Sequence, residues 1–351
     1  MQFDTRLKKL DIDFPFMVAP MVALSHAALR KAVKRYTPKG LNVLCFTEML
    51  STRRLPSCSY VHTNEIRTYQ GEFGMIPQLL GNEEGFIAES IERLKPLQPW
   101  GIDINMGCPV KHTLKHNWGV RLMGDIDYAS DIVRMVKRHT DLPVSVKLRA
   151  GSKDQDESYI FDFTESLEKA GADWITIHGR SREQKHKGEA DWGLVGRIQK
   201  ARNIPVVGNG NIQTADDAIS VIKDFGCDGA MVARAVTARP WIFWQIAHKL
   251  GYEEAPEGMQ GLLPPMTPEE EGREYIKFII QFAKDLDELF LMEDYKVDKF
   301  RFLMITNHKW FEWGHSLVRR LSSKKTMKDI IAELEEYQKN FSFILKSKIN
   351  L

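Results

Sequence analysis

The stretch LPVSVKLRAGSKDQDESYIFDFTESLEKAGADWITIHG, residues 142–179, decides the fold. Its two ends, 142–149 and 173–179, are short and mostly apolar rather than alternating. Parallel strands that are buried on both faces have this pattern. The segment between them, 158–172, has a helical pattern and closes at Gly171, a common helix stop. The stretch therefore predicts a strand, a helix and a second, parallel strand.

Similar apolar runs recur along the chain. The eight runs cover residues 14–20, 42–48, 76–81, 100–106, 142–149, 173–179, 204–210 and 227–234. The segments between them look helical, most clearly at 83–97, 128–140, 158–172 and 214–226. Strands that alternate with helices in this way predict an α/β fold, a (β/α)₈ TIM barrel. A doubly wound open sheet is the alternative, but no GxGxxG follows the first run.

The amino-acid composition changes after Leu250. Residues 251–266 are rich in Pro, Gly and Glu and are typical of a linker, and residues 267–351 look helical throughout. We expect a barrel domain over 1–250, a linker over 251–266 and a small all-helical bundle over 267–351. Within the bundle, the helical segments are expected at 270–290, 296–314, 316–325 and 327–346.

Composition excludes several classes of protein. The net charge of +2 is too small to indicate a polyanion partner by itself, so any basic surface must be local. No run of apolar residues is long enough to span a membrane. The four cysteines lack the spacing of a zinc site, so we expect no metal. The first residues have no signal-peptide core, and we expect a cytoplasmic protein with reduced thiols.

Polar residues end most of the predicted strands. In a barrel of this kind these ends meet at one rim, where the chemistry occurs. Each residue alone has an ordinary structural explanation, but lysine is rarely buried without a partner. The set predicts a site that contains an amide, a thiol, a lysine, an imidazole and a glycine turn. Its members are Gln78, Asn105, Cys108, Lys147, His178 and residues 209–211.

The same residues indicate the class of cofactor. Backbone N–H groups near Gly208, Gly210 and the pair Ala233-Arg234 would allow close approach of a phosphate. Gln78 offers a donor and an acceptor to a planar ring. Lys147 could stand beside an anionic reduced flavin, which indicates FMN, or could form a Schiff base with pyridoxal phosphate.

Several motifs resemble those of the tRNA-dihydrouridine synthases, FMN-dependent (β/α)₈-barrel enzymes with a C-terminal helical domain. They occur in family order and cover about residues 14–245. The matching pieces are APM (19–21), PQLLG (77–81), DINMGCPV (103–110), VKLRAG (146–151), ITIHGRSREQKHKGEADW (175–192), PVVGNGNI (205–212) and GCDGAMVARA (226–235).

The resemblance implies a role for each matching position. Cys108 is implied as the catalytic acid, and Asn105 is implied to face the target base. The residues implied to bind FMN are Pro20, Met21, Val22, Gln78, Lys147, His178, Asn209, Gly210, Asn211, Ala233 and Arg234. Lys111, Arg180 and Lys185 lie in basic segments of the active rim, and we expect them to contact the RNA substrate.

Two positions depart from the family pattern. Ala233 stands where the family commonly has glycine, and its methyl group is tolerable only if φ there is negative. The loop after the cysteine reads Asn117-Trp118-Gly119 rather than carrying a pair of glycines. Trp118 either stacks on a base or caps the loop, and the cap is the simpler interpretation.

The implied reaction reduces the C5=C6 bond of uridine in tRNA. Hydride passes from N5 of reduced FMN to C6, the Cys108 thiol protonates C5, and NADPH reduces the flavin again. A base in folded tRNA must leave its stack to reach such a pocket. Cations between residues 309 and 328 would suit the tRNA phosphates, although a solvated helix face explains them equally well.

Two other functions compete with this one. The first is an FMN-dependent barrel oxidoreductase that acts on a small molecule. The second is an RNA-binding barrel without activity, which predicts loss of Cys108, Lys147 or His178, and all three are present. A monomer that binds one tRNA is the simplest assembly. The sequence does not indicate which uridine is modified.

Overall fold

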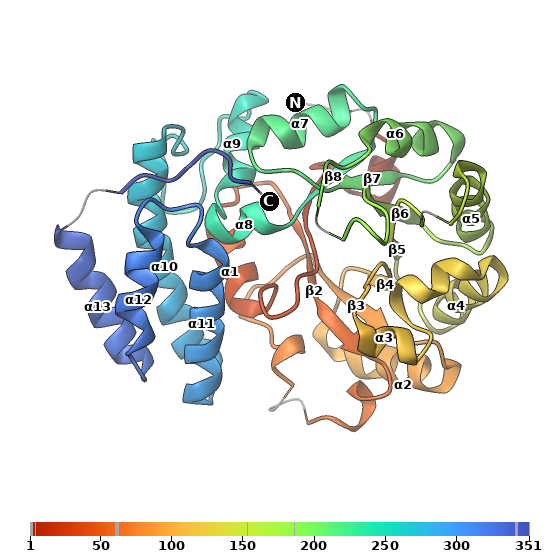
Figure 1. The fold of residues 1–351 in the computed structure, drawn as a ribbon, viewed down its shortest axis with the longest axis horizontal. Coiled ribbons are helices and arrows are strands. Elements are labelled where there is room, and N and C mark those ends of the chain that lie inside the picture. The colour runs from red at the N-terminus through yellow and green to blue at the C-terminus, as the bar shows by residue number, and fades with distance from the viewer. Residues whose placement is uncertain are drawn as a thin grey trace.

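A computed structural model describes residues 3, 5–59, 63–152, 154–185, 187–340 and 343–350. Eight parallel strands form a closed barrel in the order β1 to β8, which confirms the predicted fold (Figure 1). The strands are β1 (Phe16–Val18), β2 (Leu44–Ser51), β3 (Met75–Leu80), β4 (Ile102–Met106), β5 (Val144–Arg149), β6 (Trp174–His178), β7 (Val206–Asn209) and β8 (Gly229–Val232).

Helices surround the barrel, and four more stand beside it. The helices of the barrel are α1 (Ala27–Arg35), α2 (Glu84–Leu94), α3 (Lys111–Lys115), α4 (Ile126–His139), α5 (Glu157–Lys169), α6 (Trp192–Ala201), α7 (Ala215–Lys223), α8 (Arg234–Ala238) and α9 (Ile242–Lys249). The C-terminal helices are α10 (Pro268–Leu289), α11 (Glu293–Asn307), α12 (Gly314–Ser322) and α13 (Met327–Asn340). Figure 1 shows these four on the side of the barrel where α1 and α8 lie.

Two hydrophobic cores hold this arrangement. The smaller core fills the barrel interior, where Met17, Phe46, Ile76 and Trp174 are buried. The larger core lies between the strands and the outer helices and continues into α10–α13 without a break. Apolar area removed from water stabilises by roughly 25 cal/mol per Å², so one continuous core couples the barrel to the helices.

Local sequence explains the bounds of several helices. Thr267 begins α10 with a capping box in which Glu270 returns the hydrogen bond, and Thr214 begins α7 in the same way with Asp217. Residues 250–267, between α9 and α10, contain neither helix nor strand. Among the residues described, no helix is long and apolar enough to cross a membrane.

The C-terminal segment departs from the prediction in two places. The helix expected over 296–314 ends at Asn307, because Trp313 takes a left-handed φ of 59° and Phe311 pairs with Leu345. The helix expected over 327–346 ends at Asn340, and residues 343–350 return to the barrel as an irregular segment. Both expectations were wrong because a contact distant in sequence replaced the local helical preference.

Candidate active site

A cavity of about 320 Å³ opens at the carboxyl ends of the strands. Fourteen of the sixteen predicted site residues line it, and the barrel brings them together from seven of its strands and the loops that follow these strands. The fourteen are Pro20, Met21, Val22, Gln78, Asn105, Cys108, Lys147, His178, Arg180, Asn209, Gly210, Asn211, Ala233 and Arg234. The cavity has the size of small-molecule and cofactor pockets.

A chain of hydrogen bonds runs from the barrel interior to the cysteine. Strand register places Gln78 beside Asp103 and Asp103 beside Ser145. Asp103 accepts from Ser145 Oγ at 2.5 Å and from Gln78 Nε2 at 2.6 Å. Gln78 Oε1 then accepts from Asn105 Nδ2 at 2.7 Å, and Asn105 Oδ1 accepts from the Cys108 amide at 3.0 Å. The amide of Asn105 thus caps the loop that carries the thiol.

The loop around Cys108 is tightly packed. The Cys108 carbonyl accepts from Val120 N at 3.1 Å and from Thr113 Oγ1 at 3.2 Å. Gly119 has a φ of +61°, and a Cβ there would lie 2.6 Å from the Cys108 oxygen, so this position needs glycine. Arg149 Nε donates to the Gly107 carbonyl at 3.0 Å and fixes the start of the loop.

Two ionisable groups at the cavity have shifted pKa values, the half-buried Lys147, which lines it, and the fully buried Asp103. Lys147 Nζ donates to Asn209 Oδ1 at 3.1 Å, and burial lowers the pKa of Lys147 to about 8. Burial raises the pKa of Asp103 to about 7, although Ser145, Gln78 and the charge of Lys147 act in the opposite direction. Buried groups with shifted pKa values in a cavity are typical of functional sites.

Two further cations, Arg180 and Arg234, line the cavity. Arg180 is buried and donates to the Gly188 carbonyl at 2.6 Å and 3.0 Å, and its Nη1 lies 3.3 Å from His178 Nε2. Arg234 is close enough to Arg180 for the second charge to lower its pKa, after burial. Neither guanidinium forms an ion pair with a carboxylate within the described part of the chain. The Glu189 carboxylate acts on Arg180 only through its charge. Two adjacent guanidinium groups without a carboxylate in contact fit a phosphate.

The loop after β7 packs closely against His178 and Ala190. Gly210 has a φ of +122°, and a Cβ there would lie 3.0 Å from His178 Cδ2. Asn211 Oδ1 accepts from Ala190 N at 2.8 Å and holds the loop in place. Ala233 has a φ of −107°, so the methyl group meets the condition set by the sequence. This end of the cavity can admit a phosphate group beside the backbone.

The opposite wall of the cavity comes from the first strand and from the C-terminal segment. Val22 exposes 57% of its surface, although it is apolar. Trp310, which sequence analysis assigned to no site, lines the cavity from the turn after α11. Its ring lies 4.8 Å from the Arg239 guanidinium. A residue of the helical segment therefore completes the wall of a site built on the barrel.

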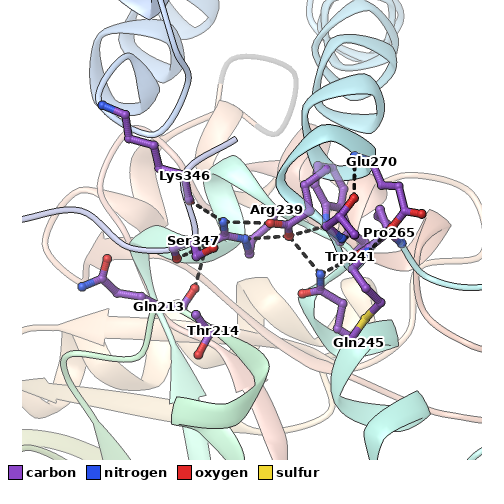
Figure 2. A network of polar contacts seen from close by, with 12 residues as sticks. Gln213, Thr214, Arg239, Trp241, Gln245, Pro265, Glu270, Lys346 and Ser347 are labelled. Atoms are coloured by element: carbon purple, nitrogen blue, oxygen red, sulfur yellow. Dashed lines mark hydrogen bonds and ion pairs between the residues drawn. The ribbon is translucent and has the colours of Figure 1, made fainter. Parts of the chain in front are cut away.

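Arg239 joins that turn to the rest of the protein (Figure 2). It pairs with Glu271 of α10 at 3.0 Å, and both side chains are almost fully buried. Its Nη1 donates to the Gln213 carbonyl at 2.7 Å, and its Nη2 donates to the Lys346 carbonyl at 2.8 Å. The Lys346 amide in turn donates to the Trp310 carbonyl at 2.7 Å. One guanidinium thus ties together the barrel, α10 and the C-terminal segment.

Of the predicted substrate residues, Lys185 is not among those that line the cavity. Lys185 is exposed, and its carbonyl accepts from Arg149 Nη1 at 2.9 Å. The side chain of Lys111 lies outside the described part of the structure. Trp118 is buried, and its Nε1 donates to Asn82 Oδ1 at 2.7 Å. Trp118 therefore caps the loop, as expected.

Sequence analysis missed Asp103, Arg149 and Trp310. Asp103 and Asn105 are two residues apart on one strand, so they point to the same face. This alternation was a usable signal for Asp103, and Lys147 and Arg149 share the same spacing. No comparable signal existed for Trp310, because its position depends on contacts between distant segments.

The chain is similar to proteins of one family. Residues 17–291 match the family described as Dihydrouridine synthase (Dus). "Probable tRNA-dihydrouridine synthase 1" of Synechocystis sp. is 32% identical over 66% of this chain and 63% of its own length. The human "tRNA-dihydrouridine(20a/20b) synthase [NAD(P)+]-like" protein is 31% identical over 68% of this chain and 71% of its own length. "tRNA-dihydrouridine synthase B" of Pseudomonas aeruginosa is 36% identical over 67% and 69%.

Solved structures share the barrel at low identity. The histamine dehydrogenase from Rhizobium sp. 4-9 has a TM-score of 0.52 and 12% identity, over 69% of this chain and 46% of that chain. The 6-hydroxypseudooxynicotine amine oxidase from Pseudomonas geniculata N1 has a TM-score of 0.50 and 12% identity, over 73% and 54%. At this identity the likeness concerns the fold alone.

Proposed function

Because this chain belongs to the dihydrouridine synthase family, we propose that it is a tRNA-dihydrouridine synthase that reduces the C5=C6 bond of a uridine. One observation carries the proposal beyond the family. Cys108 and all eleven residues predicted to bind FMN line a single cavity at the carboxyl ends of the strands. A proton donor and a cofactor site that share one cavity can act on the same base.

The residues of the cavity fit FMN. Arg180, Arg234 and the backbone at Gly210 would hold its phosphate, since neither guanidinium forms an ion pair with a carboxylate among the described residues. Gln78 uses one Nε2 proton for Asp103, so the second remains for the ring edge. Lys147 would place a positive charge beside the ring. When bound and reduced, FMN supplies the hydride that enters at C6.

Cys108 would supply the proton. The thiol releases H⁺ from Sγ to C5 of the base, and solvent then returns a proton to the thiolate. Asn105 holds the loop in place through the Cys108 amide. General acids of this kind contribute about 10²–10⁴-fold to a rate. The Arg149 guanidinium lies close enough to Cys108 for their charges to interact, so it would stabilise the thiolate that forms.

We propose NADPH as the reductant. The name of the human relative specifies NAD(P)+. This chain has no dinucleotide-binding GxGxxG after its first strand, so the nicotinamide would bind transiently in the same cavity.

We further propose that residues 267–351 bind the tRNA and that one monomer binds one tRNA. Part of the basic cluster is neutralised, because Arg320 and Lys324 both pair with Glu333. Four exposed cations have no ion pair within the described residues, and these are Lys309, Arg319, Lys325 and Lys328. These cations can contact phosphates without first breaking an ion pair within the protein.

Trp313 would add a stacking contact to these cations. Of the eight tryptophans, all of which the structure describes, it alone is exposed, with 70% of its surface accessible. It follows Trp310 of the cavity wall by three positions, so their Cα atoms lie at most about 11 Å apart. A base beside the target uridine would lie within reach of its ring.

The test uses purified protein and cells that lack the gene. The expected protein is yellow and releases FMN on denaturation, and the restored gene returns dihydrouridine to tRNA at a defined position. Cys108→Ala should keep the flavin and lose the modification. Cys58→Ala is the control, because Cys58 is also half-buried but lies outside the cavity.

Two outcomes would contradict the proposal. A yellow protein that restores no dihydrouridine would instead support an oxidoreductase acting on a small molecule. A protein that binds no flavin would remove the cofactor from the mechanism.

A further inference from the structure

The hydrogen bonds between Asp103 and Cys108 have a fixed direction. Asp103 Oδ2 accepts from Gln78 whether the carboxyl is ionised or carries its proton on Oδ1, which faces Ser145 Oγ. Asp103 therefore obliges Gln78 to turn its NH₂ group inward. The Gln78 oxygen can then only accept, and it receives a proton of the Asn105 NH₂ group. Asn105 Oδ1 is left facing the amides of Gly107 and Cys108, at 3.2 Å and 3.0 Å. Asp103 thus orients the side-chain amide of Gln78, and Gln78 orients that of Asn105.

We propose that Asp103 is a positioning residue that sets the orientation of Gln78 and Asn105 and thereby holds the Cys108 loop against the cavity. The proposal rests on the proposed function only in that Cys108 is assigned its catalytic role there. The hydrogen-bonded chain itself is a property of the protein without cofactor or substrate.

Burial makes the orientation matter. Asp103 and Ser145 are fully buried, and Gln78 is almost fully buried. A reversed Gln78 would place its oxygen against the Asp103 carboxylate and its NH₂ group against that of Asn105. A reversed Asn105 would bring its NH₂ group against two backbone N–H donors. An unsatisfied group at the buried contact between Asp103 and Gln78 would cost about 1–3 kcal/mol. Asn105 is half-buried, and its orientation follows from that of Gln78.

The identity of residue 103 follows from this requirement. A leucine would pack well in the barrel but would offer no acceptor to Gln78, whose amide could then reverse. An asparagine would keep the order, since its Oδ1 can accept from Gln78 while its Nδ2 donates to Ser145 Oγ. The asparagine depends on Ser145 in a way that the carboxylate does not, because the Ser145 hydroxyl can accept as well as donate.

The experiment uses the dependence of an asparagine at position 103 on the Ser145 hydroxyl. The variants are Asp103→Leu, Asp103→Asn, Ser145→Ala and the double variant Asp103→Asn/Ser145→Ala, all in a Cys58→Ser background. Thr176→Val is the matched control, because the buried Thr176 hydroxyl has no hydrogen-bond partner among the described residues. Thr176 also sits beside Lys147 in the barrel register. The readouts are the rate of Cys108 alkylation by iodoacetamide without flavin, and the dissociation constant of FMN.

The expected result is a pattern across the set. Asp103→Leu and the double variant should change the alkylation rate at least about fivefold and weaken FMN about tenfold, the scale of one lost buried hydrogen bond. Asp103→Asn, Ser145→Ala and Thr176→Val should stay within about twofold of the parent protein. If Asp103→Leu does not fold, the comparison of Asp103→Asn with the double variant still tests whether residue 103 orients Gln78.

Two results would overturn the proposal. One is parental alkylation and FMN binding in a folded Asp103→Leu. The other is an Asp103→Asn as impaired as the leucine variant, which would assign the effect to charge rather than to orientation. Alkylation of Cys108 needs no substrate. If the variants show the expected pattern of alkylation rates but the protein makes no dihydrouridine, this proposal stands and the proposed function is rejected.

Discussion

Replacing Gly119 with alanine tests whether the Cys108 loop is held as tightly as its packing indicates. A Cβ at this position would lie 2.6 Å from the Cys108 oxygen and 3.1 Å from the Cys108 Cβ. The left-handed backbone costs an alanine about 1–2 kcal/mol. Moving the oxygen away weakens its bonds from Val120 and Thr113, at about 0.5–1.5 kcal/mol each. The sum is about 2–5 kcal/mol.

Gly124→Ala is the matched control for this change. Gly124 ends the same short 3-10 helix that Gly119 begins, and an added Cβ there would meet no atom within 4 Å. Urea unfolding measures the loss of stability, and iodoacetamide labelling of Cys108 measures displacement of the loop. We expect Gly119→Ala to lose stability or to label at a changed rate, and in either case to lose dihydrouridine formation. A Gly119→Ala protein that matches Gly124→Ala in all three measurements would refute the reasoning.

Four further predictions follow from the buried polar groups and from the exposed tryptophan. The raised pKa of Asp103 means that, between pH 4 and 7, the folded state keeps a proton that the unfolded state releases. The free energy of unfolding should therefore fall as pH rises through this window, by at most about 4 kcal/mol. Asp103→Asn should reduce this pH dependence, measured by urea unfolding at pH 4.5 and 7.5. Arg239→Leu should lower the free energy of unfolding by about 3–5 kcal/mol because Glu271 is left buried without its partner. The double variant Arg239→Leu/Glu271→Leu should recover much of this stability. An equal loss of stability in the single and the double variant would contradict the prediction. Arg234→Gln should raise the dissociation constant of FMN at least about tenfold in a flavin fluorescence titration, the scale of a lost charge-assisted bond, while the exposed Arg121→Gln should leave it unchanged. Trp313→Ala should weaken tRNA binding about 5–100-fold with stability unchanged, and tRNA should quench the fluorescence of the parent protein more than that of the variant.

Much of the barrel could be read from the chain because buried parallel strands have a strong local pattern. All eight predicted runs contain a strand, with ends that differ by a few residues. The longest departure is at β2, which extends to Ser51 with a register shift between Phe46 and Met49. Fourteen predicted site residues converged because strand order and strand direction fix which ends meet.

The C-terminal segment was harder to predict because its helices end for reasons outside themselves. The sequence 308–314 continues a helical pattern, but its aromatic residues serve different purposes. Trp310 and Phe311 are buried, and Trp313 is exposed. Phe311 pairs with Leu345, more than thirty residues away, and no local propensity contains that pairing.

The sequence by itself determined the eightfold alternation of strand and helix and the polar residues at the strand ends. Both are local patterns, since a buried strand and a helix stop are written in a few neighbouring residues. Only the tertiary structure decided that Asp103 supports Gln78 and Asn105, that Arg180 and Arg234 lie close together, and that Trp310 lines the cavity. These relations depend on register between strands and on contacts between distant segments. The free energy that selects them comes from burying polar groups together, and it exists only once the barrel has closed.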